Sequence, residues 1–405
     1  MVTQELTVTL KPSNKPLVQG CPGVPKTYPA IVGTLEVRST SIIPQQVDSV
    51  TIVFATVDTL RSKPRDVPGM LRKVNYEMTI PVNDRIIAMD VPFLIGIRTD
   101  ICPTSEGSRG TTTHRLEVNV NSGKQSREYL FPVVISTYDT LPLYRQFNEP
   151  ISKVVDSRDN AVMVDYSLPT SAIGPHEELV VNFKLSTNPV YPKLADKVKL
   201  KKITMEIVEV FDCRCDKSFI KESTLVSSIK DYGNTYLGVR GLTESLTISQ
   251  KPSENDKYRL FLKHQDPKLL RTNASVNNNS SSSSNELRPL IIDYNEDTIP
   301  LTHHQPMTKR SILFSTYYEL RLFFKLSGAK DVEVKQPITI APFDRTKSIY
   351  LLKWIIKESE MAEIFLQGIE KELGKISYDS KFDTLVYPQR KPSKMKSKED
   401  KESFV

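Results

Sequence analysis

The sequence predicts an all-β protein made of two antiparallel β-sandwich domains in series, followed by an amphipathic helix and a basic tail. Short runs rich in Val, Ile and Thr recur over residues 3–345, and turn residues such as Gly, Pro, Asn and Ser separate them. The 27 prolines suit strand edges and loops better than helical bundles. With 39% apolar and 25% charged residues, the composition is that of a globular protein with a hydrophobic core.

The first sandwich is predicted over residues 1–143. Its strand-like runs follow one another without a helical pattern between them, which is typical of an antiparallel sandwich. In the run at 51–57, alternation places Ile52, Phe54 and Thr56 on one face of the strand. Both faces are apolar, so the run does not indicate which one is inner. The runs are ELTVTL, AIVGTLEVRS, DSVTIVFATV, NYEMTIPV, RIIAMDVPFLIGI, HRLEVNVNS and REYLFPVVIST.

The second sandwich is predicted over residues 144–345, after a break in the pattern at 138–150. The Asn/Ser-rich stretch near 272–287 is too polar to bury and predicts a disordered loop inside this domain. The final run contains Pro337. Because proline lacks the N–H that a strand ladder needs, we expect Pro337 at an edge or a strand switch. The runs are NAVMVDYSLP, EELVVNFKLS, VKLKKITMEIVEVFD, LTESLTIS, YRLFLKH, RPLIIDY, SILFSTYYELRLFFKLS and DVEVKQPITI.

Residues 346–376 are predicted to form an amphipathic helix, because apolar residues recur there at spacings of mostly three or four. Asp344 and Ser348 are candidate N-caps. Glutamates on the polar face oppose its lysines, so anionic lipid would gain little, and we expect docking against a sandwich or a partner protein. Residues 377–405 are expected to be a mostly disordered basic tail with weak membrane contact. The side chains expected to dock are Leu351, Ile355, Phe365, Ile369 and Leu373.

The cysteines and the first residues indicate the compartment. Cys21, Cys102, Cys213 and Cys215 include no C-x-x-C pair, so we interpret them as free thiols in a reducing environment. The start of the sequence lacks the basic and apolar regions of a signal peptide. No apolar run approaches the ~20 residues that span a bilayer. We therefore expect a cytoplasmic protein, peripheral at most at the plasma membrane or endosomes.

Motifs for catalysis are missing from the sequence. There is no P-loop, no G-x-S-x-G and no paired-histidine metal motif. We therefore expect a non-enzymatic protein that needs no cofactor and no metal, and no nucleic-acid partner. The competing interpretation is a Cys/His hydrolase, in which a thiolate and a histidine act together. Its candidate residues are Cys213, Cys215, His176, His303 and His304.

Three stretches resemble arrestin-like proteins, with the fungal α-arrestins most similar. Residues 9–40, which contain VGTLEV, resemble a first N-domain hairpin with a long loop before it. Residues 88–120 resemble the stretch in which a Pro-Phe strand leads to a Pro-Ser turn and an alternating strand. Residues 319–343 are similar to the last hairpin of arrestin C-domains. The resemblance covers about residues 3–345 and implies two arrestin-like sandwiches.

The resemblance also implies a function as an adaptor. Arrestin-like proteins bind membrane proteins or their cytosolic tails, and the fungal branch recruits a HECT-type ubiquitin ligase for ubiquitination, endocytosis or sorting. That recruitment uses Pro-Pro-x-Tyr motifs read by WW domains, and this sequence has none. The nearest substitute is Leu141, Pro142 and Tyr144 in LPLY, which would otherwise pack between the domains. The alternative function is an arrestin-fold scaffold or regulatory subunit, retromer-like or sporulation-type, that acts without a ligase.

Phosphate-sensing arrestins use a buried polar core, and the resemblance raises the question of which residues would form one here. Asp90, Arg98 and Asp212 are candidates by residue type. Nothing in their spacing brings them together, and charged residues are rarely buried unless they are paired. We therefore expect each of the three side chains to be exposed.

Overall fold

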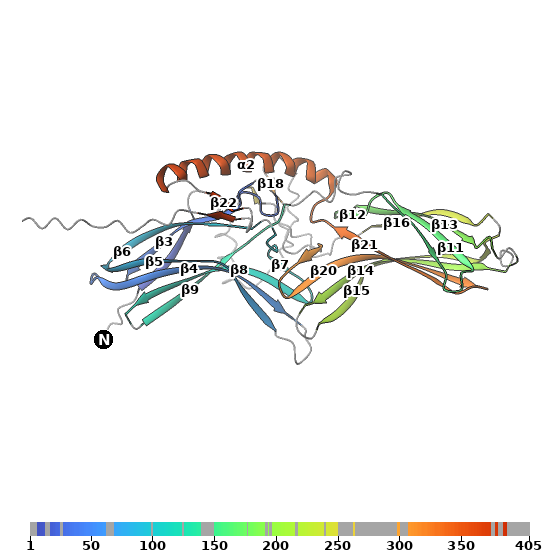
Figure 1. Ribbon diagram of the computed structural model, residues 1–405, viewed down its shortest axis with the longest axis horizontal. Coiled ribbons are helices and arrows are strands. Elements are labelled where there is room, and N and C mark those ends of the chain that lie inside the picture. The colour runs from blue at the N-terminus through green and yellow to red at the C-terminus, as the bar shows by residue number, and fades with distance from the viewer. Residues whose placement is uncertain are drawn as a thin grey trace, which may run out of the picture.

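The computed structural model contains two β-sandwiches arranged along the long axis of the molecule and one long helix (Figure 1). The predicted all-β sandwich class is confirmed. The structure describes residues 6–12, 17–24, 27–61, 69–98, 100–123, 125–138, 150–175, 177–190, 193, 197–214, 218–238, 240–249, 262–263, 298–299, 307–373, 377–379 and 384–386.

The N-terminal sandwich consists of two antiparallel sheets. In the first sheet, β3 (Ala30–Ser39) pairs with β1 (Leu6–Pro12), β2 (Val18–Gln19) and β6 (Ala88–Gly96). In the second sheet, β4 (Gln45–Leu60) lies between β5 (Met70–Ile86) and β8 (Gly110–Ser122), and β8 also pairs with β7 (Ser105–Glu106) and β9 (Gln125–Val133).

The C-terminal sandwich also has two sheets. One has the order β10 (Ile151–Asp156), β11 (Val162–Leu168), β13 (Glu178–Thr187) and β16 (Leu242–Ser249). The other has the order β12 (Ala172–Ile173), β21 (Val332–Ile340), β20 (Phe314–Ser327), β14 (Lys199–Cys213) and β15 (Phe219–Tyr236), with β19 (Lys309–Arg310) beside β20. The pairs are antiparallel except for the short parallel pair of β12 and β21.

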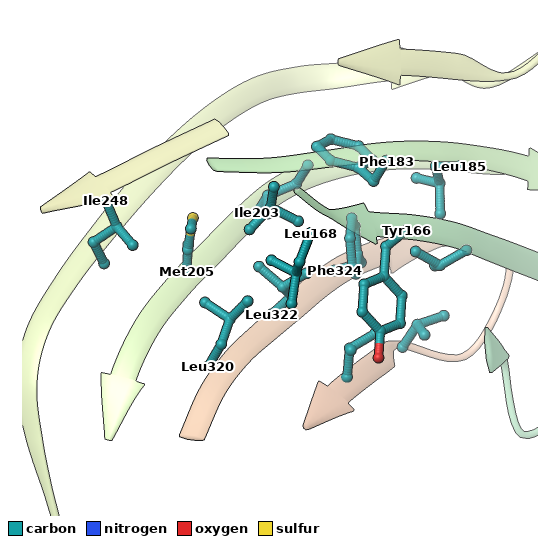
Figure 2. Packing of buried hydrophobic residues seen from close by; sticks show 14 of the residues in the cluster. Tyr166, Leu168, Phe183, Leu185, Ile203, Met205, Ile248, Leu320, Leu322 and Phe324 are labelled. Carbon is teal, nitrogen blue, oxygen red and sulfur yellow. The ribbon is translucent and has the colours of Figure 1, made fainter. Parts of the chain in front are cut away.

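Each sandwich buries its own apolar core, because the strands alternate between inward and outward side chains. Ile52 and Phe54 of β4 lie in the N-terminal core, and the opposite face of the same strand is buried too. In the C-terminal core the rings of Phe183 and Phe324 meet edge to face, with centroids 5.3 Å apart, near Tyr166 (Figure 2). Two separate cores make each half a packed unit of its own.

Pro337 occupies the kind of position that its chemistry requires. It lies opposite Glu319 of β20, and the other side of β21 pairs with β12 only at Thr339 and Ile340. In the described part of the sheet, β21 is therefore an edge at Pro337, where the missing N–H removes no ladder bond.

The predicted helix is present as α2 (Arg345–Leu373), close to the expected range. Two two-stranded sheets complete the described elements. The first pairs β17 (Leu262–Lys263) with β18 (Thr298–Ile299). The second pairs β22 (Ser377–Asp379) with β23 (Thr384–Val386), and β23 lies beside β6. The second of these sheets lies inside the tail predicted to be mostly disordered, where the run TLV favours a strand.

The boundary predicted at residues 143 and 144 stays a prediction. Strand β9 ends at Val133 and β10 begins at Ile151, on either side of it, and the residues between 138 and 150 lie outside the described part. The predicted loop at 272–287 and the tail beyond 386 also lie outside the described residues.

Candidate functional site: the junction of the two sandwiches

The junction is centred on one buried carboxylate, Asp58, near the end of β4. Its Oδ1 accepts a hydrogen bond from Thr112 Oγ1 at 2.8 Å, within the N-terminal sandwich. Its Oδ2 accepts from three groups of the C-terminal sandwich: the Ser311 hydroxyl, and the backbone N–H groups of Ile312 and Leu313 at 3.0 Å each. Hydrogen bonds to a charged acceptor are stronger than neutral ones. The Asp58 carboxylate therefore fixes one sandwich against the other.

Apolar packing surrounds this carboxylate. Leu60 of the N-terminal sandwich clusters with Phe211, Leu313 and Phe314 of the C-terminal one, all buried. Gly110 permits the close approach, because a Cβ there would lie 2.9 Å from the Phe314 ring. A side chain at position 110 would therefore push the two sandwiches apart.

Two cations lie beside the same junction. Lys309 is largely buried near Asp58 and its Nζ lies 5.9 Å from the centroid of the Phe314 ring. Burial lowers the pKa of the Lys309 ammonium, and the neighbouring Cys102, Glu209 and Asp58 oppose that shift only in part. Arg109 donates to the backbone carbonyl of Glu222 at 3.4 Å, which adds a second polar tie across the boundary.

Helix α2 packs into the junction through its first turns. Leu351, Trp354 and Ile355 form a buried cluster with Cys21 and Tyr138 of the N-terminal sandwich. The ring centroids of Tyr138 and Trp354 lie 4.8 Å apart. Phe343, just before the helix, stacks on Tyr138 with 6.4 Å between the ring centroids. The helix therefore covers the N-terminal sandwich although it follows the last strand of the C-terminal one (Figure 1).

The start of α2 is held by the C-terminal sandwich. Glu177 Oε1 accepts the backbone N–H of Arg345 at 2.7 Å, and the Arg345 guanidinium forms an ion pair with Glu177 Oε2. Arg345 Nη2 also donates to the Ala172 carbonyl at 2.8 Å. Gly174 lies so close that a Cβ there would be 2.1 Å from the Phe343 carbonyl oxygen. A distant carboxylate thus satisfies an N-terminal N–H of the helix, as a capping residue would.

Of the two candidate N-caps, Asp344 directly precedes the helix, at the N-cap position. Ser348 lies inside the first turn, where its hydroxyl donates to the Asp344 carbonyl at 2.8 Å. Ser348 is therefore not the cap, since a cap accepts from the backbone N–H groups of the first turn.

A directed chain of hydrogen bonds runs through the N-terminal sandwich beside Asp58. His114 is buried, and its Nε2 must donate to the Cys102 carbonyl at 2.9 Å, because a carbonyl only accepts. In the neutral ring, Nδ1 then accepts from Thr56 Oγ1 at 2.9 Å, and Thr56 Oγ1 accepts from Asn75 at 2.7 Å. Burial lowers the pKa of His114 to about 4, so the ring is neutral at neutral pH.

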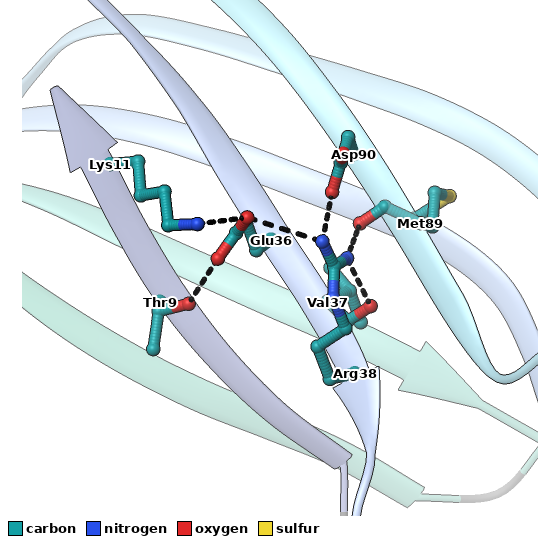
Figure 3. Close-up of polar contacts among 7 residues, drawn as sticks. All are labelled: Thr9, Lys11, Glu36, Val37, Arg38, Met89 and Asp90. Atoms are coloured by element: carbon teal, nitrogen blue, oxygen red, sulfur yellow. Dashed lines mark hydrogen bonds and ion pairs between the residues drawn. The ribbon is translucent and has the colours of Figure 1, made fainter. Parts of the chain in front are cut away.

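A second polar network lies on the outer face of the first sheet, away from the junction (Figure 3). Glu36 accepts from Lys11 Nζ at 2.6 Å and from Arg38 Nη2 at 3.2 Å. Arg38 Nη2 also contacts Asp90 at 2.5 Å, and Arg38 Nη1 donates to the Met89 carbonyl at 2.9 Å. Arg38 therefore ties β3 to β6.

The structure separates the residues considered for a polar core. Asp90 has 60% of its side chain exposed, as expected, and pairs with Arg38. Arg98 and Asp212 are half-buried rather than exposed, and each lies within ion-pair distance of an oppositely charged neighbour close in sequence, Asp100 and Arg214 respectively. The structure does not bring the three together.

The residues predicted to bind partners are described only in part. Leu351 and Ile355 are buried against the N-terminal sandwich, so they dock within the chain. The backbone of Phe365, Ile369 and Leu373 is helical, and their side chains lie outside the description. Leu141, Pro142 and Tyr144 lie outside the described residues altogether, as do Cys215, His176, His303 and His304 of the competing hydrolase interpretation.

Sequence reasoning missed Asp58, Lys309 and Glu177. One signal was available for Asp58, since a carboxylate within the apolar run TIVFATVDTL is a buried charge that needs partners. Nothing near Ser311 identified it as a partner, because the two residues are 253 positions apart.

The described residues contain no group of three or more His, Cys, Asp or Glu side chains placed to hold a metal ion. In the same part of the chain, none of the helical residues form a stretch long and apolar enough to cross a bilayer.

Comparison with known proteins finds a relative that matches nearly the whole length of the chain. No protein-family model matches the chain. The chain is similar to RHO1 GEF localizing protein 1 of Saccharomyces cerevisiae, with 23% identity over 453 aligned positions. The match covers 95% of this chain and 91% of the yeast protein, so it includes both sandwiches, the junction and helix α2.

Proposed function

We propose that the chain is a non-catalytic adaptor that localises a GEF of a Rho1-type GTPase. The observation that carries this proposal is the match to RHO1 GEF localizing protein 1. This match spans both sandwiches and the helix and is not confined to a single domain. A match over the whole arrangement of domains supports a shared function, because function resides in sites on the surfaces that the domains present together.

The geometry of the junction suits an adaptor. The Asp58 hydrogen bonds, the apolar cluster at Leu60 and the seat of α2 hold the two sandwiches in one arrangement. Partners bound to different faces of such a chain would stand at a fixed distance, and little ordering would be required on binding. This supports the scaffold or regulatory alternative that the arrestin resemblance left open.

The second candidate is the arrestin-type adaptor that links membrane cargo to a HECT-type ubiquitin ligase. The two sandwiches in series are what that resemblance implies, and this architecture favours it. A pull-down with the WW domains of such a ligase, comparing the intact chain with Tyr144→Ala, separates it from the first candidate. Binding that requires Tyr144 supports the ligase function.

The GEF proposal is tested in Saccharomyces cerevisiae cells that lack RHO1 GEF localizing protein 1. This chain is expressed there, and the distribution of fluorescent Rho1 GEFs is followed. Restoration of a lost GEF position, together with co-precipitation of that GEF, is the expected result. The proposal is wrong if the chain is stably expressed but binds none of the Rho1 GEFs and restores no distribution.

A further inference from the structure

Three isoleucines gather at the free end of the N-terminal sandwich. Ile42 and Ile43 lie in the loop between β3 and β4, and Ile87 lies in the turn between β5 and β6. The backbone N–H of Ser39 donates to the Ile87 carbonyl at 2.8 Å, so the loop and the turn are neighbours. Ile42 is 91% exposed, Ile43 57% and Ile87 47%. We name Ile42, Ile43 and Ile87 the apolar tip.

The tip is held in shape by hydrogen bonds rather than by a core. The carbonyl oxygen of Ile43 accepts from Ser39 Oγ at 3.2 Å, Ser41 Oγ at 3.4 Å and Gln45 Nε2 at 3.2 Å. At its base, Arg38 bonds Asp90 and the Met89 carbonyl, and thereby joins the strands that enter the loop and leave the turn (Figure 3). The isoleucines are thus presented in a loop that is already ordered.

The shape of the tip indicates what covers it. A side chain that is nine-tenths exposed projects from the surface and does not line a groove. A stable protein interface buries about 800 Å² on each partner around a packed centre. Ile42 together with the half-exposed Ile43 and Ile87 does not provide an area of that size. A bilayer, in contrast, deforms around a projecting apolar group and requires no complementary pocket.

The charges around the tip decide which property of the bilayer matters. Arg38 is paired with Asp90, the backbone N–H of Arg85 bonds Asp84 at 2.7 Å, and Asp48 accepts the backbone N–H of Gly123 at 2.6 Å. These five residues carry three carboxylates and two guanidinium groups, so they hold no excess of positive charge. Attraction to anionic headgroups is therefore weak, and insertion of the isoleucines has to supply the binding.

We propose that the apolar tip inserts into the surface of a lipid bilayer. The chain is then positioned with the end of the N-terminal sandwich that carries the tip against the membrane. The interaction is reversible, since three side chains bury less apolar surface than the acyl chain of a single lipid anchor. The inference does not depend on the proposed GEF partner, because its test uses the chain and vesicles alone.

The test is co-flotation of the full chain with phosphatidylcholine vesicles at about 0.1 M and about 1 M NaCl, where charge screening shortens from ~10 to ~3 Å. Binding should persist at the higher salt. The double variant Ile42→Ser/Ile43→Ser should lose about tenfold or more in partitioning. The matched control Ile220→Ser/Ile229→Ser, which removes two similarly exposed isoleucines from β15, should bind as the unaltered chain does.

A fluorescence measurement gives an independent readout. In the Ile42→Trp variant, brominated lipids should quench the new indole, whereas the natural Trp354 is buried at the junction and should stay unquenched. Absence of flotation by the unaltered chain, release at high salt, or equal binding of the Ile42→Ser/Ile43→Ser variant would each overturn the proposal. Thermal unfolding of every variant at an unchanged temperature shows that differences arise from the tip and not from misfolding.

Discussion

The carboxylate of Asp58 accepts the backbone N–H of Leu313 at 3.0 Å, across 255 positions of sequence. The two residues belong to different sandwiches, and neither is exposed. A buried carboxylate is tolerated only when its lone pairs are satisfied, and most of the partners of Asp58 come from the other sandwich. The Asp58 carboxylate therefore gains most of its hydrogen bonds only when the two sandwiches pack against each other.

Asp58→Ala should destabilise the chain by about 3 kcal/mol or more, because it leaves two backbone N–H groups and two hydroxyls without their acceptor. Urea unfolding measures the loss. The control is Asp90→Ala, which removes an exposed carboxylate from an ion pair and should cost at most ~1 kcal/mol. Equal losses for both variants would contradict the role given to the junction.

His114 should make stability depend on pH below neutrality. Its pKa is about 4 in the folded chain and near the ordinary value of 6.5 in the unfolded chain, so protons bind preferentially to the unfolded chain between these values. The contribution of neutral His114 to the free energy of unfolding should be fully present above pH ~6.5. The free energy of unfolding should be lower by about 2 kcal/mol at pH ~5. Unfolding of the His114→Gln variant over the same range should show a shallower slope, and identical slopes would refute the assignment.

The seat of helix α2 should depend on Glu177. Glu177→Gln removes the ion pair with Arg345 and weakens the acceptor at the helix start, and should cost about 1–2 kcal/mol. Trp354 is the only tryptophan of the chain and is buried against Tyr138. Its fluorescence emission therefore reports directly whether helix α2 is docked on the N-terminal sandwich. A red shift at lower urea is expected for Glu177→Gln and not for Glu178→Gln, the exposed neighbour.

Two adjacent phenylalanines of β20 offer a matched pair for the C-terminal core. Phe324 is fully buried against Phe183, whereas Phe323 on the opposite face is 37% exposed. Phe324→Ala should destabilise by about 3–5 kcal/mol. Phe323→Ala should cost clearly less, since it leaves no closed cavity. Similar costs for the two variants would show that the face assignment of β20 is wrong.

The sequence was sufficient for the elements whose pattern is set by burial. The period of 3.6 predicted the helix at 346–376 and α2 spans Arg345–Leu373, while alternation marked the core strands. Strand β15 escaped prediction although it is 18 residues long, because it is a sheet edge and most of its side chains are exposed. The sequence of an edge strand that has no apolar face shows no alternating pattern and therefore predicts a loop.

The candidate site was harder to predict than the fold. The apolar stripe of α2 indicated that it docks, but not that Cys21 and Tyr138 of the first sandwich form its seat. Contacts such as Glu177 with Arg345 join residues 168 positions apart. Such pairs depend on how two finished sandwiches meet, and local pattern carries no information about that.

The Asp58 contacts also set an order of events during synthesis. Leu313 leaves the ribosome 255 residues after Asp58, which at about 5–20 residues per second is a delay of roughly 13–50 s. In the later part of this interval, once β9 has been made, the first sandwich can form its own core, while Thr112 is the one Asp58 partner named above that is already present. The newly made half must therefore keep that edge hydrated until the last strands of the second half arrive.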